Sequence, residues 1–184
     1  TEVTDMSGRK ITLPEKIEKS FASAPPMGLL SYILAPETMT AMNLPLDSNF
    51  YFKDTKYLNP SLKKLPVVGG WHGNSKGANM ETLLSLKPQV ILAWKSDFVM
   101  KEVEKTFAKF NIPVFFIQED LVEDEPNAIR AAGVALKKEA RAEMLAKDAE
   151  TRLAYIAKIR DGIPKEKRAK VYYAEGGGRP IYGV

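Results

Sequence analysis

Two pairs of residues in this chain have side chains suited to holding a ligand. Trp71 and His72 stand together, and Trp94 and Lys95 close the apolar run at residues 90–94. An indole ring stacks on flat or apolar surfaces, and a buried strand that stops at such residues lies where open α/β sheets place their ligands. We therefore expect both tryptophans at one edge of a sheet, with their rings reaching an open cleft. The alternative is that each ring plugs the surface of its own domain.

Other side chains carry weaker signals, each with a plain alternative. His72 is the only histidine and cysteine is absent, so no metal site is expected, and His72 is otherwise a solvated side chain or a hydrogen-bond donor. Lys95 and Arg179 suit an anionic ligand, the arginine as a planar fork, or are solvated surface charges. Glu119 and Asp120 follow an apolar run, and a helix-capping role is favoured for them.

The elements that position these residues are clearest at residues 79–118. Asn79 is a good N-cap, the leucines after it give a short helix a buried face, and Pro88 ends that helix. The runs at 90–94 and 114–117 predict buried strands, and apolar residues at three- and four-residue spacing predict a helix between them. A strand, a helix and a strand with short links form a βαβ unit, so the two strands are expected to be parallel.

Further elements flank this unit. Proline at the start of a helix is favourable, so Pro25 and Pro26 suit the beginning of a helix after a short strand. The predicted elements are a hairpin at 3–13, a strand at 20–22, a helix at 25–34, a short strand at 39–42, helices at 124–136 and 139–160, and a strand at 170–174.

The order of these elements predicts an α/β fold that is left unfinished. A long helix that delivers the chain to one lone strand does not complete a fold, because a strand needs a sheet. We predict a Rossmann-like lobe with a parallel sheet at residues 1–123, connecting helices at 124–163, and the incomplete start of a second α/β lobe at 164–184. Residues after about Pro164 are then expected to be poorly buried.

Composition narrows the function classes. A hydrophobic content of 45% and a charged content of 27% are those of an ordinary folded protein, and the net charge of +4 is scattered, which argues against nucleic-acid binding. No apolar stretch approaches the roughly 20 residues of a membrane-spanning helix. The glycines at 176–178 lack the Gly-Lys-Ser/Thr ending of a phosphate loop, so a flexible turn is favoured over a nucleotide site. No cofactor is expected.

Three sequence blocks resemble a known family. Residues 4–14 (TDMSGRKITLP) resemble its opening motif, and residues 133–143 (GVALKKEARAE) resemble the motif before its backbone helix. Between them, LPVVG at 65–69, NME at 79–81 and LKP at 86–88 follow the family pattern, with Gln89 where aspartate is usual. The chain resembles the periplasmic solute-binding proteins that supply ABC importers with iron–siderophore complexes, haem or cobalamin.

This resemblance implies two lobes that close on a ligand, and a partner permease in the inner membrane. It implies a ligand such as an iron chelate, with haem, cobalamin and small oxyanions as the other possibilities, and a location in the periplasm or at a lipid anchor outside the cytoplasmic membrane. The ligand-binding residues that it implies are Pro25, Pro26, Trp71, His72, Trp94, Lys95, Tyr173 and Arg179.

Glu81 has a different implied role. The family keeps a glutamate at this position on the outer surface of the lobe, where it meets arginines of the permease; the alternative is an acid that complements the helix dipole. The competing hypothesis for the whole chain is a fragment of a Rossmann-like enzyme, of the oxidoreductase or nucleotide-sugar type. No Gly-x-Gly-x-x-Gly motif and no pairing of a nucleophile with a base supports that hypothesis.

Overall fold

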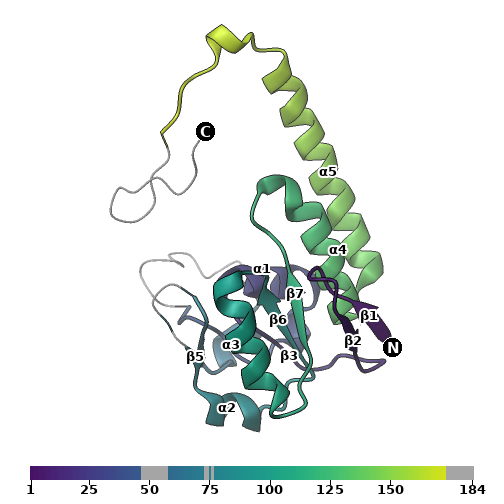
Figure 1. Ribbon diagram of the computed structural model, residues 1–184, viewed down its shortest axis with the longest axis vertical. Coiled ribbons are helices and arrows are strands. Elements are labelled where there is room, and N and C mark those ends of the chain that lie inside the picture. Colours follow the sequence, from purple (N-terminus) through teal and green to yellow (C-terminus); the bar gives the residue numbers. More distant parts are fainter. Residues whose placement is uncertain (47–57, 73–74, 76, 173–184) are drawn as a thin grey trace. The chain divides into compact units, whose positions relative to one another are not determined.

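The computed structural model describes residues 1–46, 58–72, 75 and 77–172 (Figure 1). The chain divides into two compact units, Thr1–Ala149 and Glu150–Val184. No helix in the described part of the chain has both the length and the hydropathy needed to cross a membrane.

The first unit alternates strands and helices. The strands are β1 (Glu2–Thr4), β2 (Lys10–Thr12), β3 (Ser20–Ala22), β4 (Gly69–Gly70), β5 (Gly77–Ala78), β6 (Val90–Trp94) and β7 (Val114–Ile117). The α-helices are α1 (Pro25–Leu34), α2 (Met80–Ser85), α3 (Asp97–Ala108), α4 (Glu125–Leu136) and α5 (Glu139–Asp161), which continues into the second unit. Short 3-10 turns are η1 (Pro36–Thr38), η3 (Pro60–Lys64), η4 (Val122–Asp124) and, in the second unit, η5 (Lys165–Lys167).

The central sheet is parallel, as predicted. Its strand order is β3–β6–β7, and both pairings are parallel. The strand expected at residues 39–42 is present only as two parallel bridges, from Met39 to Ser20 and from Met42 to Val67. The α/β class and the βαβ unit are therefore confirmed, and the chain beside β3 follows the sheet without forming a regular strand.

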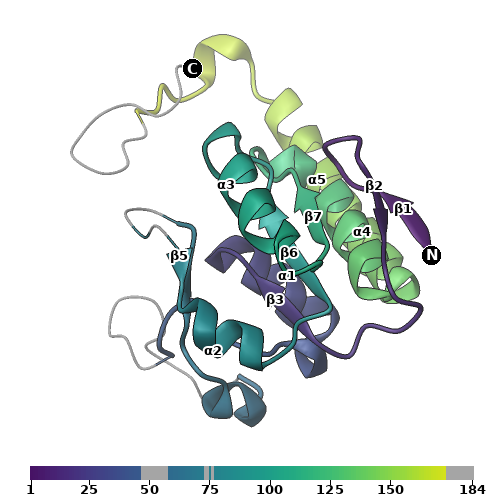
Figure 2. The same cartoon turned by 60° about the horizontal axis from the view of Figure 1, so that its bottom comes forward.

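Apolar side chains fill both faces of the sheet. Along β6, Ile91 and Ala93 join a cluster with residues of α2 and α3, whereas Val90 and Leu92 join a cluster with residues of α1, α4 and the start of α5. Successive side chains of a strand point to opposite faces, so a strand covered on both sides reads as a continuous apolar run. Figure 2 shows the same elements from a second direction.

Local signals near the site act as predicted. The Asn79 side chain accepts a hydrogen bond from the backbone N–H of Thr82 at 3.1 Å, which satisfies a free donor at the start of α2. Leu83 is fully buried on the inner side of this helix, and α2 ends before Pro88. The predicted hairpin also forms, with β1 antiparallel to β2 and Gly8 at φ +83° in its turn.

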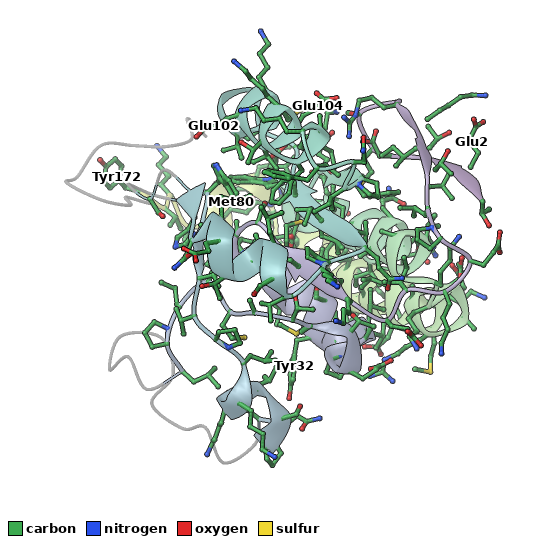
Figure 3. All side chains as sticks on the ribbon, turned by 90° about the horizontal axis from the view of Figure 1, so that it is seen from below. Glu2, Tyr32, Met80, Glu102, Glu104 and Tyr172 are labelled. Carbon is green, nitrogen blue, oxygen red and sulfur yellow. The ribbon has the colours of Figure 1, made fainter. Side chains whose placement is uncertain are left out.

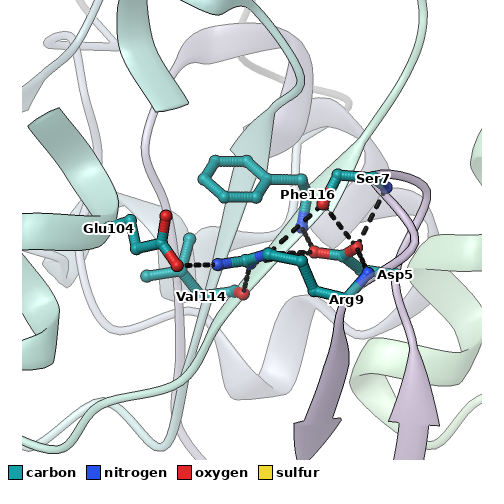
Figure 4. Close-up of polar contacts among 6 residues, drawn as sticks. All are labelled: Asp5, Ser7, Arg9, Glu104, Val114 and Phe116. Atoms are coloured by element: carbon teal, nitrogen blue, oxygen red, sulfur yellow. Dashed lines mark hydrogen bonds and ion pairs between the residues drawn. The ribbon is translucent and has the colours of Figure 1, made fainter. Parts of the chain in front are cut away.

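A buried ion pair fastens this hairpin to the sheet (Figure 4). The side chain of Asp5 is fully buried and accepts hydrogen bonds from Ser7 and from Arg9, whose guanidinium lies 2.9 Å from it. Arg9 also donates to the backbone oxygen of Val114 and pairs with Glu104. Because Val114 begins β7, one arginine joins the hairpin, the sheet and α3.

Helices α4 and α5 pack closely where they meet. Gly133 is buried in α4, and a Cβ added there would lie 2.2 Å from the Cβ of Ala142 in α5. Arg130 pairs with Glu143 across the same contact, with its Nε 2.7 Å from Oε2. Lys137, at φ +58°, ends α4 in a left-handed cap and lets the chain reverse.

The second unit has few buried side chains. The apolar seam predicted along α5 packs on the first unit's core as far as Ala149, whereas Ile156 is 59% exposed. Every residue from 165 to 172 is exposed, as expected for the segment after Pro164. Residues 170–172 lie in no strand, and the rest of the strand predicted at 170–174 falls outside the described residues. The predicted boundaries at residues 123 and 163 stay predictions.

Candidate ligand-binding edge

The chain segments that follow β3, β6 and β7 of the central sheet, and the segment that follows β4 of the small antiparallel β4–β5 sheet, meet at one edge. The backbone N–H of Ser23, just after β3, donates to Leu92 of β6 at 2.8 Å, and that of Trp71, just after β4, donates to the Ser23 oxygen at 2.7 Å. The N–H of Lys95, after β6, donates to Ile117 at the end of β7 at 2.7 Å. These bonds bring together residues that are up to 94 positions apart along the chain, from Ser23 to Ile117.

This edge also gathers polar atoms without partners. Among the described residues, the buried side-chain nitrogen and oxygen atoms that make no hydrogen bond are Ser23 Oγ, Trp71 Nε1, His72 Nδ1, Trp94 Nε1 and Glu119 Oε2. Each belongs to a residue at, or within two positions after, the carboxyl end of β3, β4, β6 or β7. Buried polar groups in folded proteins are normally paired, so these five atoms are open to a partner from outside the described chain, either a ligand or water.

The two tryptophan rings do not share one surface. Trp71 is 5% exposed, belongs to the cluster on the α3 side of the sheet, and meets Phe107 edge to face at a centroid distance of 5.5 Å. Trp94 is half-buried and packs against the cluster on the α1 and α4 side. The expectation that both rings reach one cleft is therefore wrong. Along β6, alternate side chains share a face, so Trp94 lies on the same face as Val90 and Leu92. Trp71 lies just after β4, and its ring packs into the cluster on the other face.

The other predicted residues of the first lobe lie at the same edge. Burial lowers the pKa of His72, so its imidazole is neutral at pH 7. Lys95 is half-buried and donates from Nζ to the Gln118 side chain at 2.9 Å, which joins the ends of β6 and β7. Pro25, half-buried, and Pro26, exposed, form the first turn of α1 directly after β3.

Glu119 is a site candidate for which the sequence favoured a helix-capping role. The cap role expected for Glu119 and Asp120 belongs to Asp124, whose carboxylate accepts the backbone N–H of Asp120 and of Leu121 at 3.3 and 3.1 Å. The Glu119 carboxyl is therefore left for other contacts. Burial, and then the charge of Glu125, raises the pKa of Glu119 to about 7.

The remaining predicted positions are separate from this edge or beyond the described residues. Tyr173 and Arg179 lie outside the described residues. Glu81 is exposed in the first turn of α2, where its charge complements the helix dipole. In the described ranges, no group of three or more His, Cys, Asp and Glu side chains could hold a metal ion.

An apolar cavity of about 310 Å³ lies beside α1, and Ala22 at the end of β3 and Pro25 at the start of α1 are part of its wall; the other lining residues include Leu29, Tyr32, Met39, Met42, Leu44 and Leu62. Its polar groups are mostly engaged: the Tyr32 hydroxyl, at the residue labelled in Figure 3, accepts the backbone N–H of Asn59 at 3.1 Å. Asn43, also on its wall, donates to the backbone oxygens of Ala22 and Gly69. The cavity could not be predicted from the sequence, because its wall combines residues of α1 with residues of two later segments that lie in no α-helix or regular strand.

Solved structures of known proteins with a similar fold superpose on most of this chain. An ABC transporter solute binding protein from Sulfurospirillum deleyianum is 34% identical, with a TM-score of 0.84 over 95% of this chain and 54% of that protein. The TroA-like periplasmic binding protein FepB from Veillonella parvula is 25% identical, with a TM-score of 0.72 over 89% of this chain and 50% of its own.

Sequence comparison agrees with the structural one. A vitamin B12-binding protein of Pectobacterium carotovorum is 29% identical over 103 residues, which are 56% of this chain and 36% of that protein. The chain thus spans between about a third and about a half of the length of these relatives. The family model described as periplasmic binding protein matches residues 53–183. The chain therefore belongs to the periplasmic binding protein family.

Proposed function

We propose that the protein captures an iron chelate of the siderophore type, or a related metal complex, and delivers it to an ABC permease in the inner membrane. The observation that carries this proposal is the group of unpartnered buried polar atoms of Ser23, His72, Trp94 and Glu119 at the strand ends of a periplasmic binding protein. A protein that binds and releases a ligand needs such donors and acceptors, and it needs no nucleophile or base.

The ligand contacts proposed from the first unit are Trp94, Lys95, His72, Pro25 and Pro26. Trp94 offers a half-buried indole ring, and Lys95, the next residue along the chain, offers a positive charge at the same strand end. A ring next to a cation suits a chelate that has both a flat or apolar face and negative oxygens. Tyr173 and Arg179 are proposed to complete the site.

Trp71 is given a supporting role in this proposal. Its ring contacts Phe107 within the core, so replacing it is expected to loosen the edge rather than to remove a ligand contact. The chain holds two tryptophans, so its tryptophan fluorescence, excited selectively over that of the seven tyrosines, reports on Trp71 and Trp94.

The test measures binding of ferric citrate, a ferric hydroxamate siderophore, haemin, cyanocobalamin and molybdate to the native protein by fluorescence quenching. One of the two ferric chelates is expected to bind most tightly. Trp94→Ala is expected to weaken that binding by about 1 to 3 kcal/mol, as loss of an aromatic anchor does. Trp71→Phe, the matched control, is expected to change thermal stability and leave affinity within about threefold.

Two results would contradict the proposal. Tightest binding of cyanocobalamin or molybdate would reject the iron chelate while keeping the binding function. An affinity that falls with Trp71→Phe and is unchanged with Trp94→Ala, in proteins that melt at the same temperature, would move the site to the other face of the sheet.

A further inference from the structure

The carboxyl group of Glu119 occupies an unusual place. It lies two residues after β7, next to Gln118, whose side chain holds Lys95 at the end of β6. Its Oε2 atom is buried, and no hydrogen bond to it is formed by any described residue. Glu119 forms no salt bridge in that part of the chain either, and the following helix start is capped by Asp124. Nothing in the described fold makes use of this carboxyl.

The neighbouring groups make an ionised Glu119 unfavourable. The first cause is burial, and the second is the negative charge of Glu125 in α4. Asp120, Glu123 and Asp124 follow in the connecting segment, and Lys95, at the end of the adjacent strand, is bonded to Gln118. Near neutral pH the carboxyl is therefore protonated in a large fraction of molecules.

The other unpartnered atoms at the edge indicate what a ligand must present. Indole Nε1 can only donate a hydrogen bond, so the Trp94 ring needs a hydrogen-bond acceptor from the ligand. The ammonium group of Lys95 favours a negative ligand. A protonated carboxyl adds a further donor to this set, whereas an ionised one would repel the same ligand.

Resting on the proposed function, we infer that Glu119 binds the ligand in its protonated form, donating a hydrogen bond from its carboxyl to an anionic oxygen of the metal complex. Binding is then accompanied by proton uptake, and release is favoured where the pH is higher. Glu119 is in this way a specificity-determining residue that selects anionic, oxygen-rich ligands.

The test measures the affinity of the native protein for ferric citrate at pH 6 and at pH 8.5. Ferric citrate itself changes with pH, so the readout is the ratio of dissociation constants between the native protein and Glu119→Gln at each pH. Glutamine keeps a donor in the same place and has no proton to lose. If only the protonated form binds, the ratio is expected to rise by roughly 30-fold between the two pH values.

The matched control is Glu123→Gln, which removes an exposed acid from the same segment and is expected to keep the pH dependence of the native protein. Calorimetry in buffers of different ionisation enthalpy gives a second readout. Proton uptake on binding is expected in the native protein and in Glu123→Gln, and it is expected to be lost in Glu119→Gln.

The outcomes separate this inference from the proposed function. Binding of ferric citrate with a constant ratio and unchanged proton uptake in Glu119→Gln would overturn the role of Glu119 and leave the binding function standing. If neither the native protein nor the variants bind ferric citrate at either pH, the role of Glu119 toward this anionic chelate is overturned. If the other ferric chelate also fails to bind, the proposed function is overturned as well.

Discussion

Two acids, the buried Asp5 and the half-buried Glu119, show how neighbours decide what a residue does. Burial by itself would raise the pKa of Asp5, but hydrogen bonds from Ser7, from Arg9 and from the backbone of Phe116 outweigh it, and the pKa of Asp5 is lowered. Glu119 has no such donors, and burial raises its pKa to about 7. Asp5 therefore stabilises the fold as a carboxylate, while the buried oxygen of Glu119 has no hydrogen-bond partner in the described part of the chain.

Removing the partner of Asp5 tests this account. Arg9→Met is expected to lower the free energy of unfolding by about 3 kcal/mol, because it leaves a buried carboxylate without its charge partner. Lys10→Met, the control, breaks an exposed pair with Glu2 and is expected to cost less than about 1 kcal/mol. Urea denaturation of the three proteins at pH 7 measures both values, and equal losses would contradict the assigned role of Asp5.

The same comparison has a predicted pH dependence. The lowered pKa of Asp5 means that its stabilisation is present above the model-peptide value of 3.8 and is lost as the pH falls through its folded-state pKa. The stability difference between the native protein and Arg9→Met is therefore expected to be largest near neutral pH and to shrink in acid. A difference that stays constant down to pH 3 would count against the ion pair as its cause.

At the scale of elements, close helix contacts set the geometry behind the sheet. Gly133 of α4 faces Ala142 of α5, and the distance leaves no room for a methyl group on the glycine. The Arg130–Glu143 pair lies across the same contact. Because these residues are small, the first turns of α5 pack directly on the core, where Ala142 and Ala146 are buried.

A methyl group at this contact is expected to destabilise the protein. Gly133→Ala favours an isolated helix by nearly 1 kcal/mol, but overpacking against Ala142 is expected to cost about 1 to 3 kcal/mol, giving a net loss. The double variant Gly133→Ala with Ala142→Gly is expected to recover much of that loss. Thermal melts of the single and double variants measure this coupling, and additive effects would contradict direct contact.

At the scale of the whole molecule, we propose that ligand binding and delivery use different surfaces. The proposed ligand contacts lie at the carboxyl ends of the strands, whereas Glu81 is exposed on α2, which precedes β6. A docking residue should affect transport without affecting ligand affinity. Glu81 is proposed to be such a residue, paired with arginines of the permease.

Charge reversal separates the two functions. Glu81→Lys in the native protein is expected to leave ligand affinity unchanged and to reduce uptake in whole cells by at least tenfold, because it places like charges in contact. Lys87→Glu, an exposed change just after the same helix, serves as the control and is expected to retain uptake. Normal uptake with Glu81→Lys would remove the docking role, and lost affinity would place Glu81 in the site instead.

The sequence by itself determined the elements and the class of fold. The apolar run at residues 90–94, the cap at Asn79 and the breaks at Pro88 and Pro113 are local signals, and local signals suffice where a strand or helix is continuous. They failed at residues 39–42, which join the sheet only by bridges, because pairing there depends on partners rather than on propensity.

The tertiary structure alone decided how the site is composed. Which face a tryptophan meets depends on strand register and on the turn after β4, so the sequence could place Trp71 and Trp94 at one edge but not tell that their rings point to opposite sides. Glu119 gained its raised pKa from burial and from Glu125, and both effects come from packing. The type of a residue determines which chemistry its side chain can perform, and the packing around it in the folded protein determines which of these functions it has.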